Sequence, residues 1–339
     1  PDLAERVMVE DVDDAQANEL KQKLLNDNVH YMKEKGGRTV RTQIRATIKA
    51  QKDAEEVGRK VTVHLPIPKI CQQVSKVDII AASPEITKIA DEDAAQRTVC
   101  FETELKADQE FMVEYAYDYH VDYVELDPAK ASEEQPDFCT NEQAPHIRFT
   151  PYLQELLKEI IGDETNPIIK ARKIYDFVTT KVMYSYMREY FTIECIPEYA
   201  AINLKGDCGV QALLFITLCR MTGIPARWQS GLYATEFYTG CHDWAQFYVA
   251  PYGWVFADLS FGGSAWRMGN TERWNYYFGN LDIFRMPANS EIQMEFTPEK
   301  KWLRIDPIDN QRGEIEYEDH GLSFDQVEVE QILVSMEDK

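Results

Sequence analysis

Three residues in the second half of the chain have the types and the order of a cysteine-based catalytic site. They are Cys208, His242 and Asp258. A cysteine thiolate is a strong nucleophile, a histidine can take and return its proton, and an aspartate can orient the imidazole. Taken singly, each residue is more often structural. Their occurrence together, in settings that suit each role, favours thiol chemistry.

The cysteine stands at the expected start of a helix. Asp207 is a plausible N-cap, and the apolar run from Cys208 to Met221 stops before Gly223 and Pro225, as a helix end should. First-turn N–H groups and the helix dipole stabilise a negative sulfur, so we expect them to lower the thiol pKa. The same groups could hold an oxyanion formed on a bound carbonyl.

The histidine and the aspartate fall on two expected strands, 242–249 and 254–259, separated by the turn sequence 251–253. Antiparallel pairing of these strands would bring Asp258 beside His242. Because side chains alternate along a strand, His242 should share its face with Trp244, and Asp243 should point to the opposite face.

Four separate pieces of text carry a resemblance to a known family. Residues 206–208 read Gly-Asp-Cys, and residues 220–227 read Arg-Met-Thr-Gly-Ile-Pro-Ala-Arg. Residues 242–244 read His-Asp-Trp, and residues 253–254 read Gly-Trp before Asp258. These pieces resemble the transglutaminase-like superfamily, whose members share a papain-like cysteine-enzyme core. The resemblance covers roughly residues 150 to 262.

The resemblance implies thiol-dependent acyl transfer on amides, with Cys208 as nucleophile, His242 as base and acid, and Asp258 as the orienting carboxylate. We expect peptide or amide hydrolysis, because a cross-linking enzyme must keep water out and no shield is readable in the sequence. A protein-glutamine transglutaminase or deamidase is an alternative. A non-catalytic binding or scaffold module on the same fold is another.

The resemblance also implies substrate-binding positions. Tyr184 and Tyr186 precede the nucleophile where relatives place a second oxyanion donor, and Trp244 follows the histidine. Bacterial members often carry an acidic residue where Gln246 stands. No calcium loop is readable, and adjacent strand residues such as Cys241 and His242 point apart, so we expect neither a metal nor another cofactor.

The composition and net charge of the chain restrict the classes of binding partner. The chain has 339 residues, 44% of them hydrophobic, and a formal net charge of −22. Such an acidic protein repels polyanions, so we expect neither nucleic acid nor an anionic membrane surface as a partner, but a peptide or protein substrate. The sequence contains no uninterrupted run of about 18 apolar residues, so it predicts no membrane span. The oligomeric state is left open.

The cysteines indicate a compartment. The chain has seven, an odd number, with no C-x-x-C pair. A disulfide framework or a zinc cluster is therefore not expected, and reduced thiols in a cytoplasm are the simpler interpretation. The chain opens on Pro1, so a removed leader stays an open alternative.

The predicted fold class is α+β. Residues 1–147 should form an N-terminal helix, over residues 5–34, and a β-sandwich of short alternating strands. Residues 148–290 should form a papain-like transglutaminase core, in which a central helix packs on an antiparallel sheet. Residues 291–339 read as a C-terminal β-rich extension. Polar text at 126–147 is a linker candidate.

One stretch of the predicted core, residues 262–290, reads as an aromatic loop. Its aromatic side chains could line a substrate groove or could be ordinary core beneath a long loop, and the sequence does not separate these two alternatives. The cluster consists of Trp266, Trp274, Tyr276, Tyr277 and Phe278.

Overall fold

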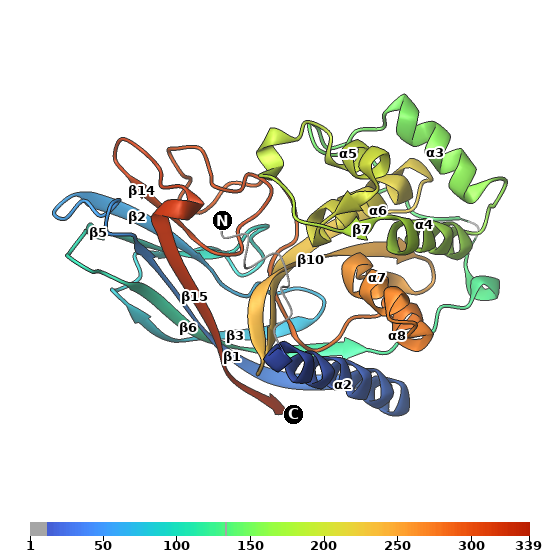
Figure 1. The fold of residues 1–339 in the computed structure, drawn as a ribbon, viewed down its shortest axis with the longest axis horizontal. Helices are drawn as coiled ribbons and strands as arrows, with labels where there is room; N and C mark the ends of the chain where they lie inside the picture. Colours follow the sequence, from blue (N-terminus) through green and yellow to red (C-terminus); the bar gives the residue numbers. More distant parts are fainter. Residues whose placement is uncertain (1–11, 133) are drawn as a thin grey trace.

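The computed structural model describes residues 12–132 and 134–339. Figure 1 shows two lobes, a β-sandwich and a mixed α/β core, with helix α2 running along one side of both. The α+β class predicted from the sequence is confirmed. The helices are α2 (Val12–Lys35), α3 (Pro151–Ile161), α4 (Pro167–Lys181), α5 (Ile196–Asn203), α6 (Cys208–Met221), α7 (Leu259–Arg267) and α8 (Thr271–Tyr276).

The sandwich consists of two four-stranded sheets, ordered β15-β1-β6-β3 and β14-β2-β5-β4. Alternating side chains of β1 and β2 are buried between them, as the sequence pattern predicts. The strands of this lobe are β1 (Gly37–Ala50), β2 (Lys60–Pro66), β3 (Val74–Ser83), β4 (Lys88–Ile89), β5 (Thr98–Glu104), β6 (Phe111–Asp122), β14 (Glu314–Tyr317) and β15 (Val327–Asp338).

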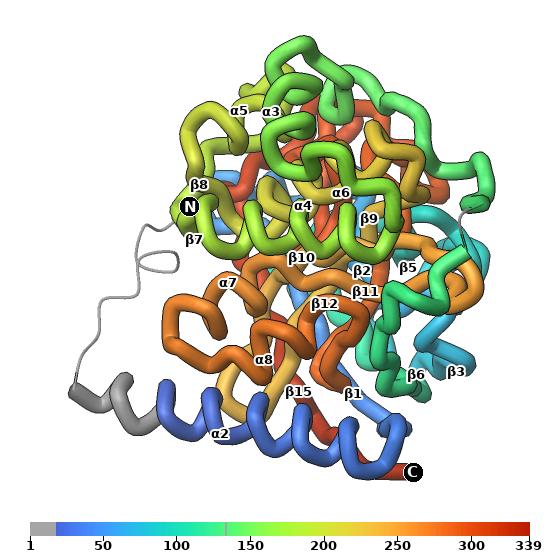
Figure 2. The backbone as a smooth tube through the Cα atoms, turned by 90° about the vertical axis from the view of Figure 1, so that its right-hand side faces the viewer, coloured from blue at the N-terminus to red at the C-terminus, as the bar shows by residue number. Residues whose placement is uncertain are grey.

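The end of the chain returns to its beginning. Strand β15 pairs antiparallel with β1, and β14 pairs antiparallel with β2. The last two strands of the chain therefore complete the two sheets of the first lobe. Figure 2 shows β15 beside β1, with the C-terminus close to one end of α2.

Helix α2 is also in contact with the core lobe. Lys33 and His30 both reach Glu272 on α8, at 2.8 Å and 3.2 Å. The helix begins at Val12 and covers most of the predicted range, while residues 5–11 of that prediction lie outside the described residues.

The core lobe is built on a five-stranded antiparallel sheet, ordered β12-β11-β10-β9-β13. Helix α6 packs on this sheet, and its residues 209–220 are all buried, so the predicted central helix is confirmed with its predicted bounds. The strands of this lobe are β7 (Met183–Tyr184), β8 (Lys205–Gly206), β9 (Ala226–Thr235), β10 (Tyr238–Val249), β11 (Gly253–Ala257), β12 (Phe278–Gly279) and β13 (Arg285–Asn289).

The prediction of a loop over residues 262–290 is wrong. Helices α7 and α8 and strands β12 and β13 occupy most of that stretch. Gly262 and Gly263 have low helix propensity and favour a loop in the sequence. In the structure they let α7 approach α4 closely, since a Cβ atom on Gly262 would overlap the Tyr175 hydroxyl. Close packing between the helices outweighs the local preference.

Within the described ranges, every helix is too short or too polar to cross a bilayer.

Candidate active site

The sequence positions Cys208 at the first turn of α6 through its N-cap. The Asp207 side chain accepts a hydrogen bond from the Val210 N–H at 3.2 Å, so the predicted cap is confirmed. The Tyr190 hydroxyl donates to the same carboxylate oxygen, which fixes the cap further. The apolar helix behind Cys208 is buried, while the cysteine itself is only half-buried. The thiol therefore lies at the edge of the core.

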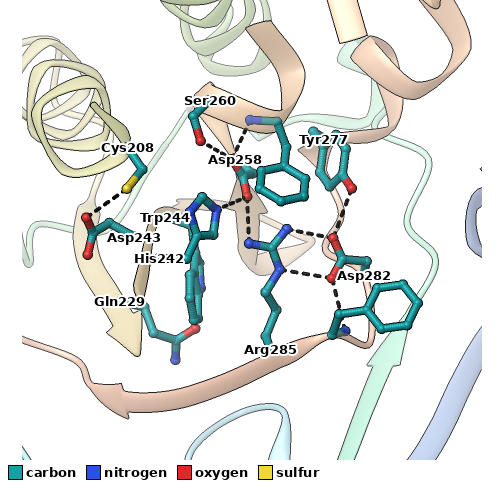
Figure 3. A network of polar contacts seen from close by, with 12 residues as sticks. Cys208, Gln229, His242, Asp243, Trp244, Asp258, Ser260, Tyr277, Asp282 and Arg285 are labelled. Carbon is teal, nitrogen blue, oxygen red and sulfur yellow. Dashed lines mark hydrogen bonds and ion pairs between the residues drawn. The ribbon is translucent and has the colours of Figure 1, made fainter. Parts of the chain in front are cut away.

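His242 and Asp258 are brought together by the hairpin of β10 and β11. These strands pair antiparallel, with Val249 opposite Gly253, as the turn sequence predicts. The imidazole Nε2 lies 2.7 Å from Asp258 Oδ2. In Figure 3 the imidazole stands between Cys208 and Asp258. Its Nδ1 is the ring nitrogen that does not bind Asp258.

Asp258 is held from four directions and is fully buried. Its Oδ1 accepts hydrogen bonds from the Phe261 N–H at 2.9 Å and the Ser260 hydroxyl at 3.3 Å. Its Oδ2, which faces the imidazole, also lies 2.9 Å from Arg285 Nη1. Burial alone would raise the pKa of Asp258, but the charges of His242 and Arg285 outweigh it and lower that pKa. The carboxylate is therefore ionised.

The pKa of the imidazole is lowered as well, but for a different reason. Burial lowers the pKa of His242 below its ordinary value, and the nearby Asp258 carboxylate only partly opposes this. His242 is thus neutral at physiological pH, as a base that must accept a thiol proton requires.

The Cys208 thiol donates a hydrogen bond to Asp243 Oδ2, with the two atoms 3.1 Å apart. Burial, together with the Asp243 and Asp207 carboxylates, raises the thiol pKa well above its ordinary value. The expectation that the helix N-terminus lowers this pKa is therefore wrong for the resting site. The dipole acts on the sulfur, but desolvation and two nearby acids outweigh it.

Asp243 belongs to a group of buried acids on the sulfur side of the site. Burial and the neighbouring Asp309 and Asp207 raise the pKa of Asp243 well above its usual range. Burial also raises the pKa of Asp309 to about 6. The Gln311 side chain donates both to Asp243 Oδ1 and to the His242 carbonyl, and so ties the C-terminal segment to the site.

The three residues predicted to bind substrate have different surroundings. Tyr184 and Tyr186 are 51% and 37% exposed and stand on the segment that leads to β8 and the nucleophile. Trp244 is fully buried, and its Nε1 donates to Gln229 Oε1 at 2.7 Å. Its ring lies 6.0 Å from the His242 ring, so it packs behind the imidazole and has no surface to offer a substrate.

The aromatic cluster splits between the two alternatives. Tyr276, Tyr277 and Phe278 are buried core residues, whereas Trp266 is 44% exposed and packs against Trp274, with ring centroids 4.7 Å apart.

The described residues contain no group of three or more His, Cys, Asp or Glu side chains arranged to hold a metal ion. All seven cysteines are free thiols.

Comparison with known proteins places the core in a family. Residues 154–259 match the model of the transglutaminase-like superfamily. The resemblance inferred from the motifs around Cys208, His242 and Asp258 is thus confirmed for this segment, and the core has the fold of a class of cysteine enzymes. The match ends one residue beyond Asp258 and therefore includes all four pieces of text that carry the resemblance.

The proteins similar to this chain include one solved structure and one relative found by sequence. A proposed cysteine protease from Cytophaga hutchinsonii superposes with a TM-score of 0.55 at 14% identity, over 89% of this chain and 98% of that one. This likeness shows that the whole two-lobed fold recurs. An uncharacterised protein from Haemophilus influenzae is 27% identical over 141 residues, which cover 34% of this chain and 37% of that protein. The chain thus spans about a third of the length of that relative.

Proposed function

We propose that this protein is a cysteine-dependent acyl-transfer enzyme that hydrolyses peptide or amide bonds. One observation carries the proposal. The His242 imidazole is held through Nε2 by the buried Asp258 carboxylate, and the next residue of the same strand, Asp243, contacts a half-buried cysteine at a helix N-terminus. A histidine that serves only packing needs neither a buried carboxylate partner nor a cysteine nearby.

In this proposal His242 Nδ1 removes the Cys208 proton as the sulfur attacks a carbonyl carbon. The resulting imidazolium is stabilised by the Asp258 carboxylate. Collapse of the tetrahedral intermediate breaks the C–N bond, and the imidazolium returns the proton to the leaving amine. Water then attacks the thioester with His242 as base, which releases the acid and restores the thiol.

The first turn of α6 supports an oxyanion site. Because the first four N–H groups of a helix have no partner within it, the backbone N–H of Cys208 is suited to stabilise the oxyanion. The raised thiol pKa indicates that the resting pair is neutral rather than thiolate–imidazolium. Proton transfer then accompanies attack on the substrate.

The surroundings of the sulfur favour an open site and a peptide or protein substrate. Met183, Tyr184 and Tyr238 are each at least half exposed, and Tyr184 is close enough to Cys208 for the thiolate charge to raise the tyrosine pKa. The similar Cytophaga hutchinsonii structure is described as a proposed cysteine protease. Transfer to an amine, as in a transglutaminase, remains the alternative that an acceptor amine would reveal. Seven free thiols favour a reducing compartment such as the cytoplasm.

The test combines substrate turnover with thiol labelling. A fluorogenic peptide library, with and without an added primary amine, is assayed with the wild type and with Cys208→Ala, His242→Ala and Cys139→Ala. We expect turnover to fall by at least about 10³-fold in the first two variants, because each removes a reacting group. Cys139→Ala, at another half-buried free thiol, should keep wild-type turnover.

Iodoacetamide labelling followed by peptide mass analysis supplies the second readout. Cys208 should label slowly at mildly acidic pH and faster above neutrality, and His242→Ala should slow this labelling. The outcome that contradicts the proposal is an inactive wild type whose Cys208 is labelled at the same rate with and without His242. That result would indicate a binding or scaffold module.

A further inference from the structure

Arg285 is an unusual residue for the interior of the core. Its side chain is fully buried at the start of β13. Two carboxylates surround it. Nη2 and Nε bind Asp282 at 2.6 Å and 2.9 Å, and Nη1 lies 2.9 Å from Asp258 Oδ2. A buried guanidinium needs one carboxylate for compensation, and Asp282 already supplies it in bidentate geometry. The contact with Asp258 is therefore not needed to compensate the charge of Arg285. We infer that it serves Asp258 instead.

The oxygen that Arg285 approaches is the one that faces the imidazole. Asp258 Oδ2 lies 2.7 Å from His242 Nε2, while Oδ1 is held by the Phe261 N–H. With both oxygens fixed, the carboxylate cannot rotate away from the imidazole. The guanidinium is itself fixed over the Phe261 ring, 4.4 Å from its centroid. Figure 3 shows this chain of contacts from His242 through Asp258 and Arg285 to Asp282.

The backbone segment that carries Asp282 and Arg285 is hydrogen-bonded to the β-sandwich lobe. On strand β6 of the sandwich, the Tyr117 hydroxyl donates to the Arg285 carbonyl at 3.0 Å. Two residues further on, the Tyr119 hydroxyl donates to the Asp282 carbonyl at 3.2 Å. Both tyrosines are fully buried. Two hydroxyls from one strand thus fix the backbone at both ends of the Asp282–Arg285 pair.

We propose that Arg285 is a positioning residue for Asp258 and that strand β6 of the N-terminal sandwich, through Tyr117 and Tyr119, holds Arg285 in place. This inference rests on the proposed function, since Asp258 acts through His242. It gives the first lobe a role in catalysis. The sandwich supplies the fixed surface against which the carboxylate of the site is aligned.

Strand β6 offers a matched set of variants. Tyr117→Phe/Tyr119→Phe removes two hydroxyls and keeps both rings. Tyr115→Phe removes a third hydroxyl from the same face of the same strand, where it is buried and has no hydrogen-bond partner in the structure. We expect the double variant to lower kcat about tenfold at unchanged KM, because neither hydroxyl touches substrate. Tyr115→Phe should match the wild type.

Two Arg285 variants test the charge itself. Arg285→Lys keeps a cation but cannot bind both carboxylates in the same geometry, so we expect kcat to fall about tenfold at unchanged KM. Arg285→Gln removes a cation that lowers the His242 pKa. The acidic limb of its pH–rate profile should therefore move to higher pH, a change that a purely structural role would not produce. The other titratable groups around His242 and Asp258 are Asp282, Tyr175, Tyr233 and Tyr277.

The outcomes separate this inference from the proposed function. Thermal midpoints of all variants show which are folded, and the double tyrosine variant keeps the test decisive if Arg285→Gln does not fold. If the wild type turns over substrate but both the double variant and Arg285→Lys keep wild-type kcat and pH profile, the positioning role is overturned and the function stands. If the wild type is inactive and His242→Ala does not change the rate of Cys208 labelling, the proposed function itself fails.

Discussion

Asp258→Asn is the substitution that separates the charge of the site from its shape. The two side chains have nearly the same volume, but each carboxylate oxygen faces donors. Oδ1 accepts from the Phe261 N–H at 2.9 Å, and Oδ2 faces His242 Nε2 at 2.7 Å and Arg285 at 2.9 Å. An asparagine amide has only one acceptor oxygen. Either orientation therefore turns its NH₂ group toward another donor.

The size of the effect follows from this conflict. Removing one partner of a buried charge pair costs about 3–5 kcal/mol, and the lower end applies here because Arg285 keeps Asp282. In a chain of 339 residues, about 3 kcal/mol lowers the thermal midpoint by about 4 °C. The imidazolium also loses its counter-charge and its orientation. We therefore expect kcat to fall by about 10²–10⁴-fold.

The assay is peptide turnover and thermal unfolding at neutral pH, with Asp127→Asn as control. Asp127 also caps a helix, since it accepts from the Ala129 N–H at 3.0 Å, but it is far more exposed than Asp258. This control should keep both kcat and the midpoint. An Asp258→Asn protein with kcat within threefold of the wild type would refute the reasoning, because the charge and orientation would then be dispensable.

Two further predictions concern the sulfur side of the site. The pKa of Asp309 is raised to about 6 in the folded protein and is about 4 in the unfolded chain. The wild type therefore loses stability as pH rises from about 4 to about 6. Asp309→Asn should thus gain stability relative to the wild type over that range, by up to about 3 kcal/mol in urea unfolding, and a gain equal at every pH would contradict this. Gly209→Ala should lower the thermal midpoint despite its better helix propensity, because its Cβ would lie 2.7 Å from Asp243 Oδ2 and overlap the Tyr190 hydroxyl. A raised midpoint would show that the first turn can relax.

The elements that position the candidate site could be predicted because their signals are local. Asp207 caps α6 with its own side chain, and Gly223, at φ +78°, ends the helix in a conformation that favours glycine. The turn before Gly253 likewise sets the hairpin that brings Asp258 to His242. Each signal lies within a few residues of the structure it determines.

The residues that adjust the chemistry of the site could not be predicted, because they depend on tertiary contacts. Arg285 gives no sign in its neighbours that it binds an aspartate 27 positions earlier in the chain. Tyr117 lies on an alternating strand and looks like its neighbour Tyr115, yet only Tyr117 reaches the Arg285 carbonyl. Asp243 was placed on the face away from His242, and the packing of α6 on that face brings it to Cys208.

Two buried aspartates of the candidate site have pKa values shifted in opposite directions for one reason. Burial disfavours both carboxylates, and only Asp258 has a cation, Arg285, within contact distance. Asp243 faces other acids instead, so its pKa is raised. In the proposed mechanism this asymmetry leaves Asp258 as the charged group that stabilises the imidazolium.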